Sequence, residues 1–159
     1  MKIKQALSSL LGEIGNGLIV CSNGKMGRVL WALRKERNEP NDDLILQGSM
    51  GASVSVGLGM ALNTDKQVYV LTGDGALLMK LGSLATVAKF KLENLHIIVL
   101  NNGANESTGG QPTAFEEVRD FVSKYCKIID IEKGYEDLDR PDVSCQQIKN
   151  NFVGKINKN

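Results

Sequence analysis

Short apolar runs alternate along the chain with longer amphipathic stretches, and this alternation restricts the fold more than any other feature of the sequence. Each run is typical of a β-strand, and residues 95–100 are apolar enough to be buried on both faces of a sheet. The amphipathic stretches are long enough to cross a sheet and return, which favours parallel strands. The pattern predicts an α/β fold, a doubly wound and mainly parallel sheet with helices on both faces.

A length of 159 residues corresponds to one domain, so we expect residues 1–159 to fold as a single unit. The tail, residues 150–159, is rich in Asn and Lys and is expected to fray or to be truncated. The expected strands are residues 18–21, 44–46, 67–71, 95–100 and 127–131, and the expected helices are residues 3–14, 26–37, 52–62, 77–90, 115–125 and 145–152.

Charge and cysteine content exclude several classes of function. The chain has 19 basic and 18 acidic residues, whereas nucleic-acid binders usually carry a basic excess, so we expect no nucleic-acid partner. The three cysteines are far apart and form no CxxC pair, which excludes common zinc and thioredoxin sites. Reduced thiols in a cytoplasmic protein are the expectation. Because residues 48–62 are too polar to span a bilayer, we expect no membrane association, and we expect no signal peptide.

Polar segments, most of them rich in glycine, follow the predicted strands. In open α/β sheets ligands bind outside the carboxyl ends of the strands, so these segments are where function should be sought. They are SNGKMG at 22–27, QGSMG at 47–51, TGDG at 72–75 and NNGANESTGGQPT at 101–113.

Two standard nucleotide motifs fail in this sequence. The P-loop pattern GxxxxGK[ST] fails because Met26 follows the Gly-Lys pair and Ile19 stands at its first position. The dinucleotide pattern GxGxxG fails at all three GxG sequences, whose last position is Leu78, Leu62 or Val20. We therefore expect neither nicotinamide nor flavin binding at these turns.

Asp74 at the end of one predicted strand and Asn101-Asn102 at the end of another offer hard oxygen ligands. Such ligands suit Mg²⁺, which usually shares its coordination shell with phosphate oxygens. A helix beginning near Ala76 would direct its first N–H groups to the same edge, where they favour an anion. These turns predict Mg²⁺ together with a phosphorylated ligand, unless each is only a tight turn that the fold requires.

The sequence GDG at 73–75, followed after residues 76–100 by Asn101-Asn102, resembles the diphosphate-binding motif of thiamine diphosphate enzymes. The sequence GSMG at 48–51 stands where that superfamily carries a glycine and a bulky apolar residue. Residues 73–113 are similar to the phosphonopyruvate and sulfopyruvate decarboxylases, and the resemblance covers about residues 18–131.

The resemblance implies roles for individual residues. Asp74, the Asn102 side chain and the Ala104 carbonyl would bind Mg²⁺, and the N–H groups of Gly75 and Ala76 would donate to the diphosphate. At the other end of the cofactor, the carbonyl of Gly48 would accept from the 4′-amino group of the pyrimidine, and Met50 would wedge the cofactor into a V shape. The implied cofactor-binding set is Gly48, Ser49, Met50, Gly73, Asp74, Gly75, Ala76, Asn102 and Ala104.

The superfamily also requires a second domain type, which holds the pyrimidine and supplies the Glu that activates the cofactor. A chain of 159 residues has no room for it, and Glu13 and Glu36 lie in predicted helices away from the strand ends. We therefore expect no certain catalytic residue here and a partner subunit that carries the Glu, as in the sulfopyruvate decarboxylases that consist of two chains.

The substrate implied by the resemblance is a small anionic 2-oxo acid that loses CO₂ to give an aldehyde. Residues 101–113 favour 3-phosphonopyruvate. Lys25, Ser107 and Thr108 are candidate substrate contacts, although Lys25 could be a surface lysine and the two hydroxyls could only shape the loop. Three alternatives stay open: a sulfopyruvate decarboxylase beta subunit, another oxo-acid enzyme resembling acetolactate synthase, and a non-catalytic cofactor-binding module.

Overall fold

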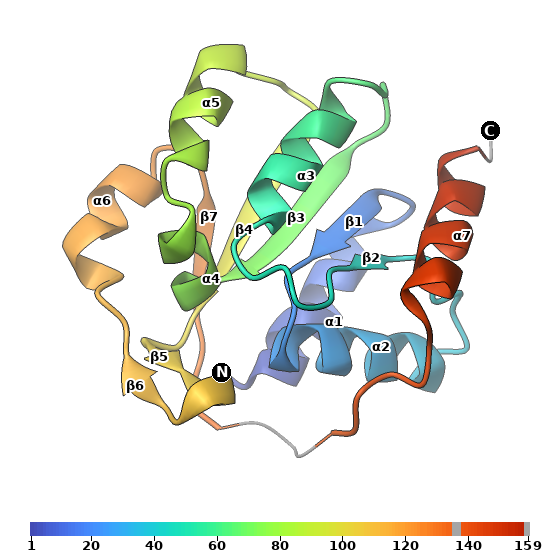
Figure 1. The fold of residues 1–159 in the computed structure, drawn as a ribbon, viewed down its shortest axis with the longest axis horizontal. Coiled ribbons are helices and arrows are strands. Elements are labelled where there is room, and N and C mark those ends of the chain that lie inside the picture. The colour runs from blue at the N-terminus through green and yellow to red at the C-terminus, as the bar shows by residue number, and fades with distance from the viewer. Residues whose placement is uncertain (135–137, 158–159) are drawn as a thin grey trace.

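The computed structural model describes residues 1–134 and 138–157, and its centre is a five-stranded parallel sheet (Figure 1). The strand order is β2-β1-β3-β4-β7, and every pair of neighbours is parallel. The strands are β1 (Leu18–Cys21), β2 (Leu44–Ile45), β3 (Val68–Gly73), β4 (Leu95–Asn101) and β7 (Lys127–Asp130). The predicted parallel sheet is confirmed.

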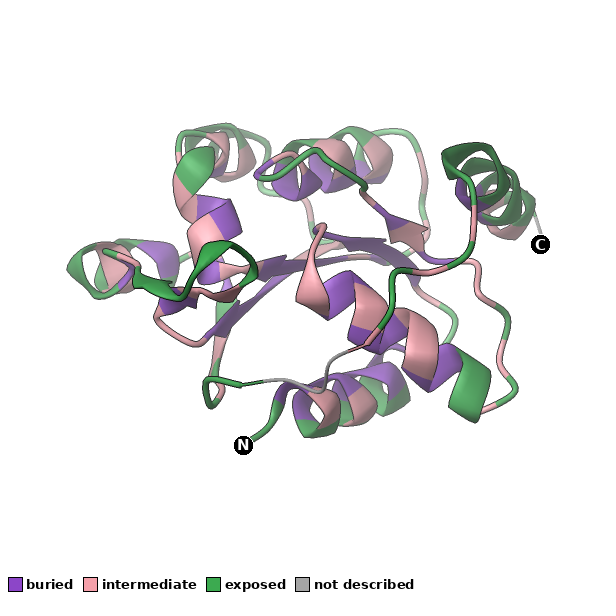
Figure 2. Ribbon diagram, turned by 60° about the horizontal axis from the view of Figure 1, so that its bottom comes forward, coloured by how far each residue is buried: buried purple, intermediate pink, exposed green. Residues whose placement is uncertain are grey.

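Helices cover both faces of this sheet, as the sequence predicts. Helices α1 (Ile3–Ile14) and α2 (Lys25–Glu36) pack on one face. The other face carries α3 (Ser53–Ala61), α4 (Asp74–Met79), α5 (Ser83–Phe90), α6 (Arg119–Val122) and α7 (Cys145–Ile156). Figure 2 shows buried residues along the sheet and on the sides of the helices that face it.

Alternation of side chains along the strands divides the interior into two cores. In β1, Ile19 and Cys21 belong to the core beneath α1 and α2, whereas Leu18 and Val20 belong to the core beneath α3 to α7. All four are fully buried. A strand buried on both faces must be apolar throughout, which is why the β1 sequence, LIVC, lacks the polar alternation of a surface strand.

The order of the strands creates a crevice between β1 and β3. After β1 the chain enters α2 on one face, and after β3 it enters α4 on the opposite face. The two connections therefore diverge at the carboxyl ends of neighbouring strands. Such a reversal of direction is where open α/β sheets bind ligands.

Two predicted helices differ from the structure. The helix expected at 77–90 is two helices, because Lys80 leaves helical geometry with φ −136° and ψ 39°, and α5 restarts after Gly82. The first of them, α4, begins at Asp74, directly after β3. The helix expected at 115–125 is only the 3₁₀ turn η2 (Glu116–Val118) followed by α6, and Val118 interrupts it with φ −120° and ψ 5°.

Helix α7 continues through most of the tail for which fraying is expected. It runs to Ile156 and packs beside β2, with Phe152 buried in the core. The ammonium group of Lys155 lies 3.1 Å from a carboxylate oxygen of Asp42, which fixes the helix on this side of the sheet. Residues 158–159 of the tail lie outside the described residues. No helix in residues 1–134 or 138–157 has the length and apolar character needed to cross a membrane.

Candidate functional site

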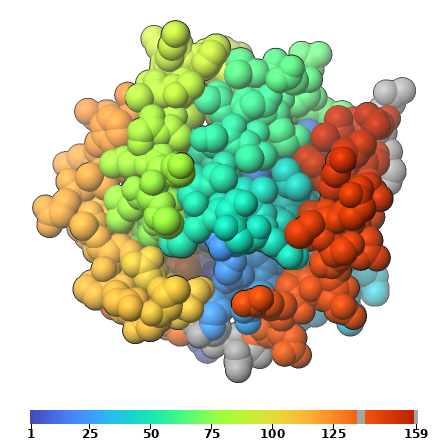
Figure 3. Space-filling model, viewed as in Figure 1, coloured from blue at the N-terminus to red at the C-terminus, as the bar shows by residue number. Residues whose placement is uncertain are grey.

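A cleft with a volume of about 190 Å³ lies at the carboxyl ends of the strands. Segments that follow β1, β2, β3, β4 and β7 all contribute to its walls. In Figure 3 the surface is recessed between the gold loop after β4, the turquoise segment after β2 and the blue start of α2. The residues of the expected site that line this cleft are Lys25, Met50, Gly73, Asp74, Gly75, Ala76, Asn102, Ala104, Ser107 and Thr108.

The register of β3 and β4 brings the two predicted turns together. Gly73 is paired with Leu100, so the residues that follow each strand emerge side by side at the same edge. Asp74 then begins α4, and Asn102 begins the loop after β4. The pairing of parallel strands thus places a carboxylate and an amide, far apart in sequence, in one cleft.

The two adjacent asparagines have different surroundings. Asn101 Nδ2 donates to Glu116 Oε1 at 3.0 Å and to Asp130 Oδ1 at 2.9 Å, and the residue is buried. Hydrogen bonds from Arg119 and then from Asn101 lower the pKa of Asp130 below its usual range. These contacts join β4 to β7 and give Asn101 a structural role. Asn102, by contrast, lines the cleft.

The hydrogen bonds of Asn102 orient its amide. Its Nδ2 donates to Glu106 Oε2 at 2.9 Å, and its Oδ1 accepts from the N–H of Ala104 at 3.0 Å. Glu106 also accepts from the backbone N–H of Gly134. One carboxylate therefore connects Asn102 to the segment that follows β7.

Asp74 is a buried carboxylate with no cationic partner among the described residues. It is only 2% exposed, and its Oδ2 accepts from the hydroxyl of Thr113 at 2.5 Å. No Lys, Arg or His in residues 1–134 and 138–157 forms an ion pair with it. Asp43, buried to a similar degree, receives two hydrogen bonds from Arg34. Since buried charges are normally paired or bind metals, the surroundings of Asp74 favour a cation in the cleft.

A small hairpin that sequence analysis does not predict lines one side of the cleft. Strands β5 (Ala104–Asn105) and β6 (Gln111–Pro112) are antiparallel, with the 3₁₀ turn η1 (Glu106–Thr108) between them. The hairpin carries Asn105 close to Gly75, where an added Cβ would collide with Asn105 Oδ1. In this loop, Asn105 and Glu106 line the cleft and Thr113 contacts Asp74, and the sequence analysis assigns a role to none of the three. Their only signal is their position in the long polar loop after β4.

The segment after β2 is only partly in the cleft. Met50 lines it and is 37% exposed. Gly48 lines a neighbouring cavity, and Ser49 lines neither, although its carbonyl accepts a hydrogen bond from the N–H of Ala52. Of the three residues that the resemblance assigns to this segment, the structure thus brings one to Asp74 and Asn102.

Comparison with known proteins agrees with this geometry. Residues 20–150 match the family model described as thiamine pyrophosphate enzyme, C-terminal TPP binding domain. The chain belongs to this family. Thiamine pyrophosphate is another name for thiamine diphosphate, so the resemblance inferred from the two motifs is confirmed, together with the fold that it implies.

This thiamine diphosphate-binding domain has curated relatives of longer chain. Phosphonopyruvate decarboxylase of Streptomyces viridochromogenes is 43% identical over 109 residues, which are 68% of this chain and 26% of the relative. Sulfopyruvate decarboxylase subunit beta of Methanothermobacter thermautotrophicus is 38% identical over 109 residues, 69% of this chain and 57% of the relative. Acetolactate synthase isozyme 1 large subunit of Escherichia coli is 34% identical over 79 residues, 49% of this chain and 14% of the relative. The chain spans less than two thirds of the length of each.

The donors of this thiamine diphosphate-binding domain fit Mg²⁺ in kind. Asp74, Asn102 and the carbonyl of Ala104 offer a carboxylate, an amide and a main-chain oxygen at one cleft, all of them hard ligands. The described residues contain no group of three or more His, Cys, Asp or Glu side chains that could hold a metal ion. A cation bound here would therefore need further oxygens from a small molecule bound beside it, and a diphosphate group supplies such oxygens.

Proposed function

We propose that this chain is the diphosphate- and Mg²⁺-binding part of a decarboxylase that converts 3-phosphonopyruvate to phosphonoacetaldehyde and CO₂. The family match supports thiamine diphosphate as the cofactor. The observation that carries the proposal for Mg²⁺ is the buried carboxylate of Asp74, which lines the cleft without a cationic partner in the described part of the chain.

Each end of the cofactor has proposed contacts in this chain. Asp74, Asn102 and the Ala104 carbonyl hold Mg²⁺, and the N–H groups of Gly75 and Ala76 donate to the diphosphate. At the opposite end, Gly48 and Met50 contact the pyrimidine and the bend of the cofactor, with Gly73 and Ser49 as parts of the same two segments. Thiamine diphosphate, when bound, supplies a nucleophilic carbon for the 2-oxo group and accepts the electron pair that CO₂ leaves behind.

For the substrate, 3-sulfopyruvate is the second candidate. Relatives of both names are similar to this chain over 109 residues, at 43% and 38% identity. Both acids carry a tetrahedral anion on C3, so either substrate requires the same kind of contact. Lys25, Ser107 and Thr108 line the cleft and are the proposed substrate contacts.

A pyrimidine-binding partner subunit completes the proposed enzyme by supplying the activating Glu. In this chain Glu13 forms an ion pair with Lys127 at 2.9 Å, and Glu36 forms one with Lys4 at 2.8 Å, both on helices away from the cleft. Glu106 lines the cleft but accepts hydrogen bonds from Asn102 and Gly134. The name of the sulfopyruvate relative, subunit beta, also supports a partner. Three unpaired thiols support a cytoplasmic location as part of the proposal.

The decisive experiment measures cofactor binding by the chain co-purified with a pyrimidine-binding subunit. Thiamine diphosphate is titrated by calorimetry in the presence of Mg²⁺ into the wild-type complex and into the Asp74→Ala variant. We expect the variant to bind about 100-fold more weakly or worse, because even outer partners of metal ligands cost about 10–100-fold when removed. Asp65→Ala, at an exposed carboxylate outside the cleft, is the matched control and should bind as the wild type does.

Turnover then tests the chemistry. The complex should release CO₂ and an aldehyde from phosphonopyruvate or sulfopyruvate faster than from pyruvate, which lacks the anion on C3. Equal cofactor affinity in the Asp74→Ala and wild-type complexes refutes the proposed metal site. Turnover by this chain without any partner refutes the need for a second subunit.

A further inference from the structure

A second cavity with a volume of about 470 Å³ adjoins the cofactor cleft. Four residues line both spaces, namely Asn23, Gly24, Lys25 and Ser107, so the two share a wall. Residues 23–25 follow β1, and Ser107 belongs to η1 in the loop after β4. The loops are in close contact, since a Cβ added to Gly24 would lie 3.2 Å from the hydroxyl oxygen of Ser107.

Cationic side chains dominate the charge of this second cavity. Lys25, Arg28 and Arg140 line it, and the described residues that line it include no Asp or Glu. The N-terminus of α2 lies at Lys25, and the positive end of its helix dipole adds to the positive potential of the cavity. Its first turn contains no acidic residue and instead carries Lys25 and Arg28. Basic residues at the positive end of a helix repel its dipole, and a bound anion would relieve that repulsion.

A hydrogen bond between distant parts of the chain assembles the cationic wall. The guanidinium of Arg28 donates through Nη1 to the carbonyl of Leu138 at 2.8 Å. This contact holds the segment after β7 against the first turn of α2. Arg140, two residues beyond Leu138, consequently reaches the cavity although it is remote from α2 in sequence.

Apolar packing fixes one wall of the cavity. Ile45 and Leu46 line it, and a Cβ added to Gly27 would lie 2.7 Å from Ile45 Cγ2. Helix α2 therefore packs directly on β2 through Gly27, which fixes Arg28 relative to the sheet. Charged groups beside buried apolar side chains interact more strongly with an anion than they would in open water.

We propose that this cavity binds the tetrahedral oxyanion on C3 of the substrate, a phosphonate or a sulfonate, through Lys25, Arg28 and Arg140. This inference rests on the proposed function, because it assumes that a 2-oxo acid reacts in the adjoining cleft. The C3 anion stays on the product, whereas the carboxylate leaves as CO₂. The C3 anion is therefore the better occupant of a cationic cavity. Cations around the carboxylate would stabilise the ground state and oppose loss of CO₂, whereas cations around the C3 anion stabilise ground and transition states alike.

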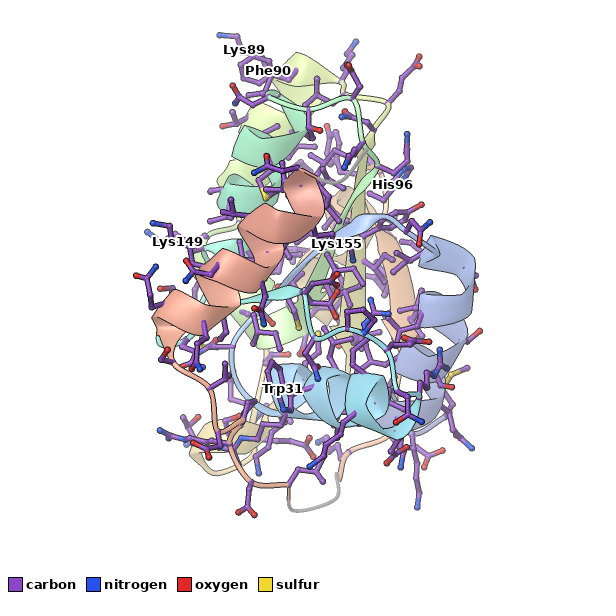
Figure 4. All side chains as sticks on the ribbon, turned by 90° about the vertical axis from the view of Figure 1, so that its right-hand side faces the viewer. Trp31, Lys89, Phe90, His96, Lys149 and Lys155 are labelled. Atoms are coloured by element: carbon purple, nitrogen blue, oxygen red, sulfur yellow. The ribbon has the colours of Figure 1, made fainter. Side chains whose placement is uncertain are left out.

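The test uses methylphosphonate and methanesulfonate as probes that contain the anion but no reactive 2-oxo acid. Each is titrated by calorimetry into the full chain and into the Arg28→Met and Arg140→Gln variants. We expect the probe of the true substrate class to bind the wild type more tightly, and each variant to bind it at least about tenfold more weakly, as loss of a charged hydrogen bond implies. Lys89→Met removes one positive charge at the end of the molecule away from α2 (Figure 4) and should change the affinity by less than about twofold.

Two further measurements keep the outcomes distinct. Arg28→Lys retains the charge and should regain part of the affinity for the probe. Circular dichroism shows whether Arg28→Met is folded. Because Arg140 is exposed, Arg140→Gln gives an independent test. Thiamine diphosphate binding should be the same in all of these variants, because none of the substituted residues is a proposed cofactor contact. If the wild type fails to bind the cofactor, that result counts against the proposed function and not against the anion site. No binding of either probe to the wild type, or equal binding in the arginine and Lys89 variants, overturns the anion site.

Discussion

Two buried aspartates of this domain differ in the groups that surround their carboxylates. Asp43 and Asp74 are 3% and 2% exposed, and both are acceptors of hydrogen bonds. Asp43 has a guanidinium beside it, whereas Asp74 has only the hydroxyl of Thr113 in the described part of the chain. The difference separates a charge that stabilises the fold from one that we propose as a ligand of Mg²⁺.

Gly75 offers a prediction that depends on one missing methyl group. A Cβ at this position would collide with Asn105 Oδ1 in β5. The Asn105 side chain would have to move, and because Asn105 is adjacent to Ala104 in β5, its movement would disturb the Ala104 carbonyl, one of the proposed Mg²⁺ ligands. We expect Gly75→Ala to weaken binding of thiamine diphosphate and Mg²⁺ by about tenfold or more, since overpacking costs about 1–3 kcal/mol.

The control for this substitution is Gly82→Ala, a glycine with nothing within 4 Å of an added Cβ. Calorimetric titration of the cofactor into both variants, each in complex with the partner subunit, should separate them. Unfolding in urea shows whether a variant is folded at all. A Gly75→Ala complex that binds the cofactor as tightly as the Gly82→Ala complex contradicts the close packing of β5 on this turn.

Sequence reasoning places some residues of the site but cannot place others. Asp74 and Asn102 are predictable because each follows a buried strand, and parallel strands deliver their ends to one edge. Asn105 reaches the cleft, and Thr113 reaches Asp74, only through a hairpin whose strands have two residues each. Such short strands carry no periodic pattern, so their pairing depends on contacts that the sequence does not display.

At the scale of helices and strands, the predicted bounds agree best with the structure where the sequence pattern is local and amphipathic. Helix α1 and strand β1 have the predicted bounds, Ile3–Ile14 and Leu18–Cys21, because their apolar spacing alone determines which face is buried. The break at Lys80 is not predictable in this way, since apolar residues continue on both sides of it.

One ion pair joins two elements across the sheet edge. Arg34 in α2 donates from Nε and Nη2 to the two carboxylate oxygens of Asp43, at 2.8 Å and 3.0 Å, directly before β2. Both side chains are buried. We expect Arg34→Met to lower the free energy of unfolding by about 3 kcal/mol, because the substitution leaves the buried Asp43 charge with only Lys155, at 3.8 Å, beside it among the described residues.

Urea unfolding monitored by circular dichroism gives this free energy. Lys127→Met breaks an exposed pair with Glu13 and is the matched control, for which we expect a change of about 1 kcal/mol or less. The double variant Arg34→Met/Asp43→Leu removes both charges and should recover most of the loss. If the single Arg34 variant and the Lys127 variant prove equally stable, the pair does not hold α2 to β2.

At the scale of the whole molecule, one sheet serves two cores. Cys21 lies in the core beneath α1 and α2, and Cys126 lies in the core on the opposite face. The strands between them contribute side chains to both cores in alternation, so neither core can open without disturbing the strands of the other. The sheet is thus expected to couple the two layers into one cooperative unit.

The cysteines allow this coupling to be measured. Burial, and to a smaller extent the charge of Asp43, raises the pKa of the Cys21 thiol, and burial raises the pKa of Cys126 to about 12. Because the thiolate is the reactive form, both should resist alkylation in the native protein while the exposed Cys145 reacts. With rising urea, Cys21 and Cys126 should become reactive together, at the midpoint of the loss of secondary structure.

Mass spectrometry of alkylated peptides resolves the three thiols in one sample, and Cys145→Ser removes the signal of the native reaction. Reaction of Cys126 at a lower urea concentration than Cys21 would mean that the face with α3 to α7 unfolds first. That result would also bear on the proposed cofactor site, since α4 belongs to this face and α2 to the other. A cleft built from the ends of β1 and β3 keeps its geometry only while both faces remain attached to the same sheet.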